Sequence, residues 1–115
     1  MNPPEKRRAP RKRAPDHATV TVTDVISGRR LGLLGNLSAS GMLLLDIDEP
    51  PSEAVFQVSF VLPNGLRTGA APLEVGIQEQ WHELAASTGR VWAGYRIIAI
   101  SDEDGRRLDR WLAHA

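Results

Sequence analysis

The chain has 115 residues, of which 42% are hydrophobic and 24% are charged, as expected for one compact domain with its own core. Its formal net charge is zero, and it contains no cysteine, which excludes disulfide bonds and thiolate metal sites. No apolar run approaches the roughly 20 residues of a membrane span, and no apolar segment follows the basic N-terminus as in a signal peptide. We therefore expect a cytoplasmic protein without membrane insertion.

Basic residues are concentrated near the start of the chain. Six of the 14 lysine and arginine residues lie between Lys6 and Arg13, whereas the rest of the chain is mildly acidic. Two prolines, one within this stretch and one just after it, disfavour a helix, so the segment should be extended. We predict that residues 1–16 form a flexible N-terminal arm and that residues 17–115 form the folded body of a single domain. Such a local positive field favours an anionic partner.

Most of the body shows the period-two alternation of β-strands, with many β-branched residues and with turn signals between the runs. The strongest turn signal is Asn64-Gly65, because both residues tolerate the positive φ of a type I′ hairpin turn. Six short strands at this spacing predict a mainly β fold, a six-stranded antiparallel barrel whose closure removes exposed sheet edges. The predicted strands cover residues 17–26, 29–37, 42–47, 55–62, 66–83 and 90–100.

The hydrophobic period changes after Ser101. Leu108, Trp111 and Leu112 have the i, i+3, i+4 spacing of one helical face. Ser101 with Asp104 is similar to a capping box. We therefore predict a short C-terminal helix that Trp111 docks on the barrel, since a helix of this length is marginal by its own propensity.

Two motifs in the chain suit a guanine nucleotide. Arg7 and Arg11 are four residues apart, so on an extended segment they share one face. A guanidinium group binds phosphate oxygens in pairs, can read the O6/N7 edge of guanine and stacks on purines. Further along, Asn36 offers a donor and an acceptor to a base edge, Ser38 offers a hydroxyl group, and Gly41 permits a sharp turn or the close approach of a ligand. Together the motifs predict a clamp for an anionic, guanine-containing ligand.

In this setting of six predicted strands and a closing helix, the two motifs resemble the PilZ domain, a bacterial receptor for cyclic di-GMP. The resemblance covers nearly the whole chain, and both halves of the family pattern, Arg-x-x-x-Arg and Asp/Asn-x-Ser-x-x-Gly, are complete. It implies the split barrel of that family. The residues that carry it are Arg7, Arg11, Asn36, Ser38, Gly41 and, in the last strand, Tyr95.

The resemblance also implies roles for these residues. The arginines of the arm would bind the phosphates and stack on guanine, while the second motif would line the guanine pocket. Lys6 precedes the first arginine, where a basic residue goes with an intercalated ligand dimer, so two ligand molecules per domain are implied. Asn36 replaces the commoner Asp and removes a charge near the guanine donors, which bears on affinity. The predicted binding residues are Lys6, Arg7, Arg8, Arg11, Asn36, Ser38 and Gly41, with no other cofactor and no metal.

The function implied is a receptor whose arm changes conformation on binding cyclic di-GMP and which then signals to an unidentified protein effector. Motility, exopolysaccharide production and transcription are the processes that the family suggests. The alternative is a barrel adaptor whose basic arm binds nucleic acid without base specificity, although this use is less expected. Steep salt dependence and indifference to the polyanion would mark that alternative.

Other chemistry is not expected. The sequence has no Ser/His/Asp set, glycine-rich phosphate loop or carboxylate pair of the catalytic kind, so we do not expect an enzyme. The histidines are too scattered for a metal site and are expected to be structural or at the surface; they are His17, His82 and His114. The acidic residues before the Pro-Pro pair favour a solvated loop over a cation site; they are Asp46, Asp48 and Glu49. The tryptophans are expected in the core or under the helix, with Trp92 as a possible partner contact; they are Trp81, Trp92 and Trp111.

Overall fold

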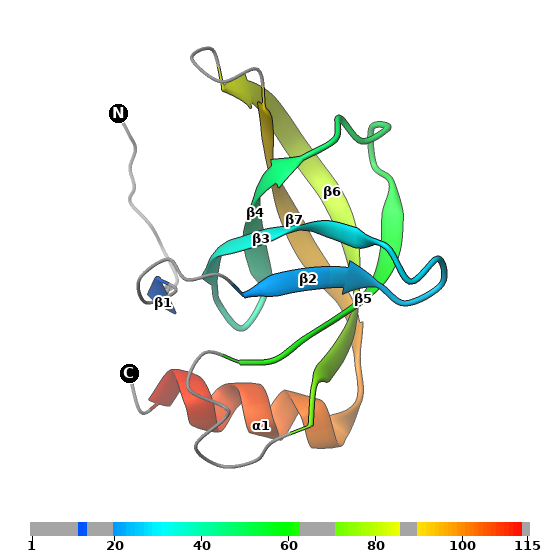
Figure 1. Ribbon diagram of the computed structural model, residues 1–115. Helices are drawn as coiled ribbons and strands as arrows, with labels where there is room; N and C mark the ends of the chain where they lie inside the picture. Colours follow the sequence, from blue (N-terminus) through cyan, green and yellow to red (C-terminus); the bar gives the residue numbers. More distant parts are fainter. Residues whose placement is uncertain (1–11, 14–19, 63–70, 86–89, 114–115) are drawn as a thin grey trace.

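The computed structural model describes residues 12–13, 20–62, 71–85 and 90–113. Strands make up most of this part of the chain, and one helix follows the last strand (Figure 1). The elements are β1 (Lys12–Arg13), β2 (Thr21–Asp24), β3 (Arg30–Leu37), β4 (Gly41–Ile47), β5 (Val55–Phe60), β6 (Leu73–Ala85), β7 (Arg90–Ile100) and α1 (Asp102–Ala113).

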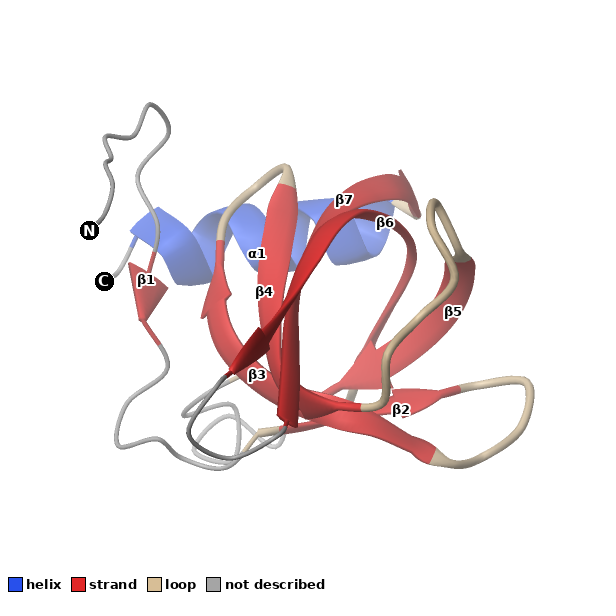
Figure 2. Ribbon diagram, turned by 90° about the horizontal axis from the view of Figure 1, so that it is seen from above, coloured by secondary structure: helices blue, strands red, loops and turns tan. Residues whose placement is uncertain are grey.

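The strands β2 to β7 close into an antiparallel barrel. The hydrogen-bonded order is β1-β3-β2-β5-β6-β7-β4, and β4 pairs back onto β3, which completes the ring. Seen from above, the strands enclose a ring and α1 lies outside it (Figure 2). The predicted six-stranded antiparallel barrel with a C-terminal helix is therefore confirmed. Within the described ranges, no helix is long and apolar enough to span a membrane.

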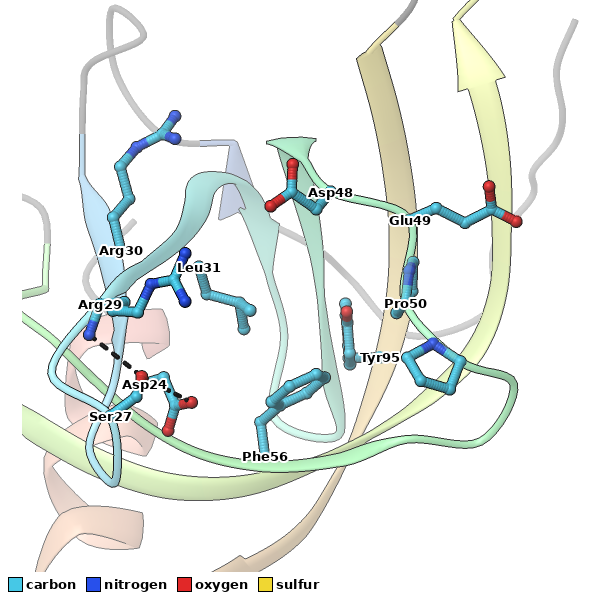
Figure 3. Close-up of a pocket in the computed structure, with 11 residues that line it drawn as sticks. Asp24, Ser27, Arg29, Arg30, Leu31, Asp48, Glu49, Pro50, Phe56 and Tyr95 are labelled. Carbon is cyan, nitrogen blue, oxygen red and sulfur yellow. Dashed lines mark hydrogen bonds between the residues drawn. The ribbon is translucent and has the colours of Figure 1, made fainter.

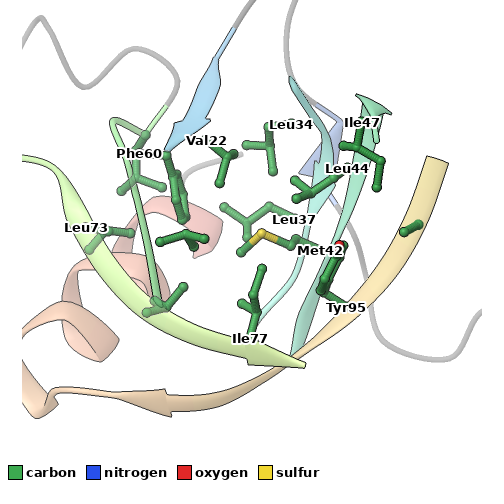
Figure 4. Close-up of a cluster of buried hydrophobic side chains, with 14 of the residues drawn as sticks. Val22, Leu34, Leu37, Met42, Leu44, Ile47, Phe60, Leu73, Ile77 and Tyr95 are labelled. Atoms are coloured by element: carbon green, nitrogen blue, oxygen red, sulfur yellow. The ribbon is translucent and has the colours of Figure 1, made fainter. Parts of the chain in front are cut away.

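The core fills the inside of this ring (Figure 4). Successive residues of a strand point to opposite faces, so alternate residues of β5 and β7 are buried, as the sequence pattern predicted. Val58 and Phe60 are buried on β5, and Ala93 and Tyr95 on β7, whereas Arg96 is exposed. The buried hydrophobic cluster comprises Val22, Leu34, Leu37, Met42, Leu44, Ile47, Val58, Phe60, Leu62, Leu73, Val75, Ile77, Val91, Ala93, Tyr95 and Leu108.

A bulge in β3 changes the face on which its residues lie. The pairing with β4 shifts between Leu34 and Asn36, so that Gly35 is the extra residue. A bulge of this kind advances the alternation by one residue. Leu34 and Leu37 consequently both point into the core although they are three residues apart, and Asn36 lies on the outer face.

The first barrel strand is shorter than predicted because Asp24 ends it. Its carboxylate accepts hydrogen bonds from the backbone N–H of Ile26 (3.0 Å) and from the Ser27 hydroxyl group (3.1 Å). Asp commonly closes turns in this way. The chain therefore turns at residues 25–27, and the first two of these lie inside the range predicted as strand. The predicted strand of residues 66–83 is described from Leu73 and continues to Ala85.

The C-terminal helix begins as the sequence indicated. The Ser101 hydroxyl oxygen accepts a hydrogen bond from the backbone N–H of Asp104 (3.1 Å), which caps the helix. The predicted anchor was Trp111, but Leu108 is the fully buried residue of the helix at 2% exposure, and Trp111 is only half-buried. Leu108 is the first residue of the apolar stripe and belongs to the core cluster, against which Trp111 and Leu112 pack.

Candidate ligand-binding site

The end of the basic arm lies beside the polar corner of β3. Strand β1 pairs antiparallel with β3, with Lys12 opposite Leu37 and Arg13 opposite Asn36 (Figure 1). The arm and the second motif are thus joined by a strand pairing that the sequence pattern did not predict. Arg11 directly precedes β1 in the sequence.

Four of the predicted binding residues lie outside the described residues: Lys6, Arg7, Arg8 and Arg11. The predicted boundary between arm and body, at residue 16, also lies outside them. These assignments remain predictions.

Ser38 shapes the turn between β3 and β4. It is 1% exposed, and its backbone N–H donates to the carbonyl oxygen of Gly41 (2.9 Å). Its hydroxyl oxygen accepts hydrogen bonds from the N–H groups of Ser40 (3.3 Å) and Gly41 (3.2 Å), and its O–H donates to the Gly41 carbonyl (3.3 Å). The role that the structure assigns to this hydroxyl group is to close the turn, and its direct contact with a ligand remains a prediction.

Gly41 packs this turn against β7. A Cβ atom on Gly41 would lie 2.5 Å from the carbonyl oxygen of Tyr95, a distance that no side chain tolerates. The neighbouring Ser40 carbonyl accepts a hydrogen bond from the N–H of Ile97 (2.8 Å). The glycine predicted for a sharp turn or for ligand approach is therefore required here by the close approach of another strand. Among the described glycines, the positive φ belongs to Gly28 (76°).

A row of paired residues crosses the outer face of the barrel from β3 to β6. Asn36 is opposite Leu43, Leu43 is opposite Gly94, and Gly94 is opposite Trp81. Directly opposed residues share a face of a sheet. Neighbouring strands lie about 4.8 Å apart, so the three steps from Asn36 to Trp81 span roughly 14 Å.

Trp81 gives this row an exposed aromatic surface. Its indole ring lies over Gly94, because a Cβ atom there would be 2.4 Å from the indole Nε1. The side chain is 47% exposed, and Leu43, half-buried, adjoins it across Gly94. The site therefore combines a polar edge at Asn36 with a flat apolar surface at Trp81.

The prediction that Trp81 belongs to the core was wrong, and so was that for Trp92, which is 38% exposed. The cause for Trp81 is a bulge in β6. The pairing of β6 with β7 shifts between Glu79 and Trp81, which makes Gln80 the extra residue. Without this bulge Trp81 would lie opposite the fully buried Ala93. A bulge has no clear sequence signal, so the outward position of Trp81 could not be predicted.

Buried charges at the barrel mouth hold the loop between β4 and β5. Glu79 is 3% exposed, and its carboxylate accepts from the backbone N–H of Glu53 (2.7 Å) and contacts His82 Nδ1 (2.8 Å). The hydrogen bond from the Glu53 backbone lowers the pKa of Glu79 most, and the hydrogen bond with His82 lowers it further. The Glu79 hydrogen bond, with a further contribution from Glu49 at 3.3 Å, raises the pKa of His82.

His82 is thus a structural residue, as predicted. Of the acidic residues before the Pro-Pro pair, Asp46 lies in β4, whereas Asp48 and Glu49 lie in the loop that follows it. Asp46 forms ion pairs with Arg30 (2.8 Å) and with Arg90 (2.5 Å), so both oxygens of its carboxylate contact arginine side chains. In the part of the chain that the structure describes, no group of three metal-binding side chains comes together.

No known family model matches the sequence, and no curated protein matches it. Two solved structures share its architecture. The inhibitor of motility MotI/DgrA of Bacillus subtilis aligns with a TM-score of 0.70 and 16% identity over 93% of this chain and 49% of its own, so the chain spans about half the length of that protein. The PilZ domain with c-di-GMP of YcgR from Escherichia coli aligns with a TM-score of 0.62 and 20% identity, over 92% and 88% of the two chains. The protein therefore has the fold of a PilZ domain.

Proposed function

We propose that the protein is a receptor for cyclic di-GMP, which binds on the outside of the barrel between the basic arm and the β3–β4 corner. The observation that carries the proposal is the pairing of Arg13 with Asn36, because it anchors the arm at the polar corner. The fold adds support, since a PilZ domain of the same architecture contains this ligand in its solved structure.

The chemistry of the two segments fits the two parts of the ligand. Arg7 and Arg11 bind the two phosphates through charge-assisted, paired hydrogen bonds, and Lys6 and Arg8 add positive charge. Asn36 hydrogen-bonds to the edge of a guanine. Ser38 and Gly41 take part mainly by fixing the position of the corner and its backbone, as their contacts within the turn indicate.

We add Trp81 and Leu43 to the predicted contacts. Stacking of a base on an aromatic side chain is worth about 1–3 kcal/mol. The indole ring lies on the same outer row as Asn36, so a base held at Asn36 has an apolar surface beside it. The row is long enough for more than one base, and this supports the expectation of two ligand molecules per domain.

The output of such a receptor is a changed surface. When the arm closes over the ligand, it covers the outer face of the barrel beside Asn36. A protein effector would then meet a different surface from that of the ligand-free protein. Control of motility is the process best supported, because the inhibitor of motility shares this fold. The protein acts in this proposal by binding and not by catalysis.

Titration calorimetry with cyclic di-GMP tests the proposal, with GTP and cyclic di-AMP as competitors for specificity. Arg7→Ala, Arg11→Ala and Asn36→Ala should each weaken binding by at least about tenfold, as expected for the loss of a charge-assisted or base-reading hydrogen bond. Arg106→Ala, an exposed arginine of α1, is the matched control and should bind normally. Equal affinity for unrelated polyanions, with steep salt dependence, would replace the proposal by nonspecific nucleic-acid binding.

A further inference from the structure

The mouth of the barrel holds a cavity that the proposed function does not use. It has a volume of about 210 Å³ and opens between the β2–β3 hairpin and the β4–β5 loop (Figure 3). Phe56 and Tyr95 form its aromatic floor, with ring centroids 6.2 Å apart in an edge-to-face arrangement. Pockets for drug-sized ligands are about 300–1,000 Å³, so this cavity suits a smaller molecule and excludes a cyclic dinucleotide.

Tyr95 brings a buried polar group to this floor. The residue is 3% exposed, and its hydroxyl group has no hydrogen-bond partner among the described residues. Figure 3 shows the hydroxyl end directed toward the side of the mouth where Asp48 lies. Burial and the nearby Glu79 raise the pKa of Tyr95 to about 12, so the group stays a phenol that both donates and accepts. Buried polar groups nearly always have a partner, so this hydroxyl group is expected to bind one that the described chain does not supply.

The two walls of the mouth carry opposite charges. Arg29 lies on the hairpin wall and Asp48 on the loop wall, and neither forms an ion pair within the described part of the chain. The other charged residues nearby are engaged elsewhere. Arg30 turns toward Asp46 (2.8 Å), and Glu49 contacts His82 (3.3 Å).

The carboxylate of Asp24 is engaged too, because it closes its own turn. One cation and one carboxylate therefore remain to face a ligand across the cavity.

We propose that the barrel mouth binds a small zwitterion of amino-acid size. Its carboxylate pairs with Arg29, its ammonium group pairs with Asp48, and its side chain lies on Phe56 and supplies a hydrogen-bond partner to the Tyr95 hydroxyl group. A ligand with a single charge would pair with only one of Arg29 and Asp48 and would be repelled by the other, which carries the same charge as the ligand. The arrangement therefore selects a molecule that carries both charges.

Heteronuclear NMR tests this directly. The ¹⁵N-labelled full chain is titrated with pools of the common amino acids at millimolar concentration, and each hit is followed singly. The proposal expects at least one amino acid to shift the amide resonances of Arg29, Asp48 and Phe56. The carboxamide and the N-acetyl derivative of the hit each lack one charge and should bind about tenfold more weakly, as should the protein variants Arg29→Gln and Asp48→Asn. Both substituted residues are exposed, so these variants should fold, and Arg106→Ala is again the control.

The absence of shifts with every pool would overturn the proposal. So would a hit whose affinity is unchanged by removal of either charge. The same samples are titrated with cyclic di-GMP, so a failure at the mouth is separated from a failure of the proposed receptor function.

Discussion

The backbone of Gly41 packs so closely on the carbonyl oxygen of Tyr95 that a Cβ atom there would lie 2.5 Å away. Because the contact is with backbone, no side-chain rotation relieves it. Gly41→Ala should therefore lower the free energy of unfolding by about 1–3 kcal/mol, the usual range for overpacking. Urea denaturation measures the change.

The control for that substitution is Gly105→Ala. A Cβ atom at Gly105 meets nothing within 4 Å, and the residue lies in α1. Alanine favours a helix by about 1 kcal/mol relative to glycine, so this variant should be at least as stable as the wild type. Similar destabilisation of both variants would mean that the contact with Tyr95 is not what requires Gly41.

The hydrogen bonds of His82 predict a pH-dependent stability. His82 has a pKa raised above its ordinary 6.5, so its contribution is complete below pH 6.5 and is lost as the pH rises through the raised value. Glu79 has a pKa lowered below 4.5, so its contribution is complete above pH 4.5 and is lost as the pH falls through the lowered value. The pair should contribute most between about pH 4.5 and 6.5.

The measurement is the melting temperature of the wild type minus that of His82→Gln, followed across this pH window and above it. The difference should be largest in the window and should shrink as the pH rises above it. Glu83→Gln, at an exposed position of the same strand, should show no such profile. A difference that does not vary with pH would contradict the charged pairing of His82 with Glu79 and Glu49.

Tyr95→Phe should make the protein more stable when no ligand is bound at the mouth. The substitution keeps the ring that packs on Phe56 and removes a buried hydroxyl group without a partner in the described residues. An unsatisfied buried polar group costs about 1–3 kcal/mol, so an increase of about 1 kcal/mol is expected in chemical denaturation. A clear loss of stability would show that the hydroxyl group is already hydrogen-bonded in the folded protein.

Trp81→Ala should weaken cyclic di-GMP binding by about 1–3 kcal/mol if a guanine base stacks on the indole. The side chain is half-exposed, so the variant should remain folded. Trp92→Ala is the matched control, because Trp92 also points outward from β7 but pairs with Glu83, outside the row that leads to Asn36. Equal effects of the two variants would count against a specific stacking position.

The alternation of apolar residues was sufficient to predict the barrel, because burial on one face of each strand fixes a period of two. It predicted the buried residues of β5 and β7 and the exact range of the last strand. It did not predict the bulges at Gly35 and Gln80, two of several in the barrel, which reverse the alternation and so place Asn36 and Trp81 on the outer face.

The arrangement of the candidate site was predictable in part for a related reason. Residue types with nucleotide-binding chemistry are visible in the sequence, and Asn36, Ser38 and Gly41 do meet at one corner. Their individual roles depend on packing across strands. Ser38 closes its own turn. Gly41 makes room for the carbonyl oxygen of Tyr95, a residue more than 50 positions further along the chain. The pairing of β1 with β3 likewise depends on register, which local pattern does not encode.

The most direct test of the central claim is an NMR map of the cyclic di-GMP site on the ¹⁵N-labelled chain. The account predicts that saturating ligand shifts the amide resonances of Arg13, Asn36, Leu43 and Gly94, the outer row next to the arm, and leaves those of Arg29 and Asp48 at the barrel mouth unchanged. Shifts confined to the mouth or to α1, or no shifts at all, would contradict it.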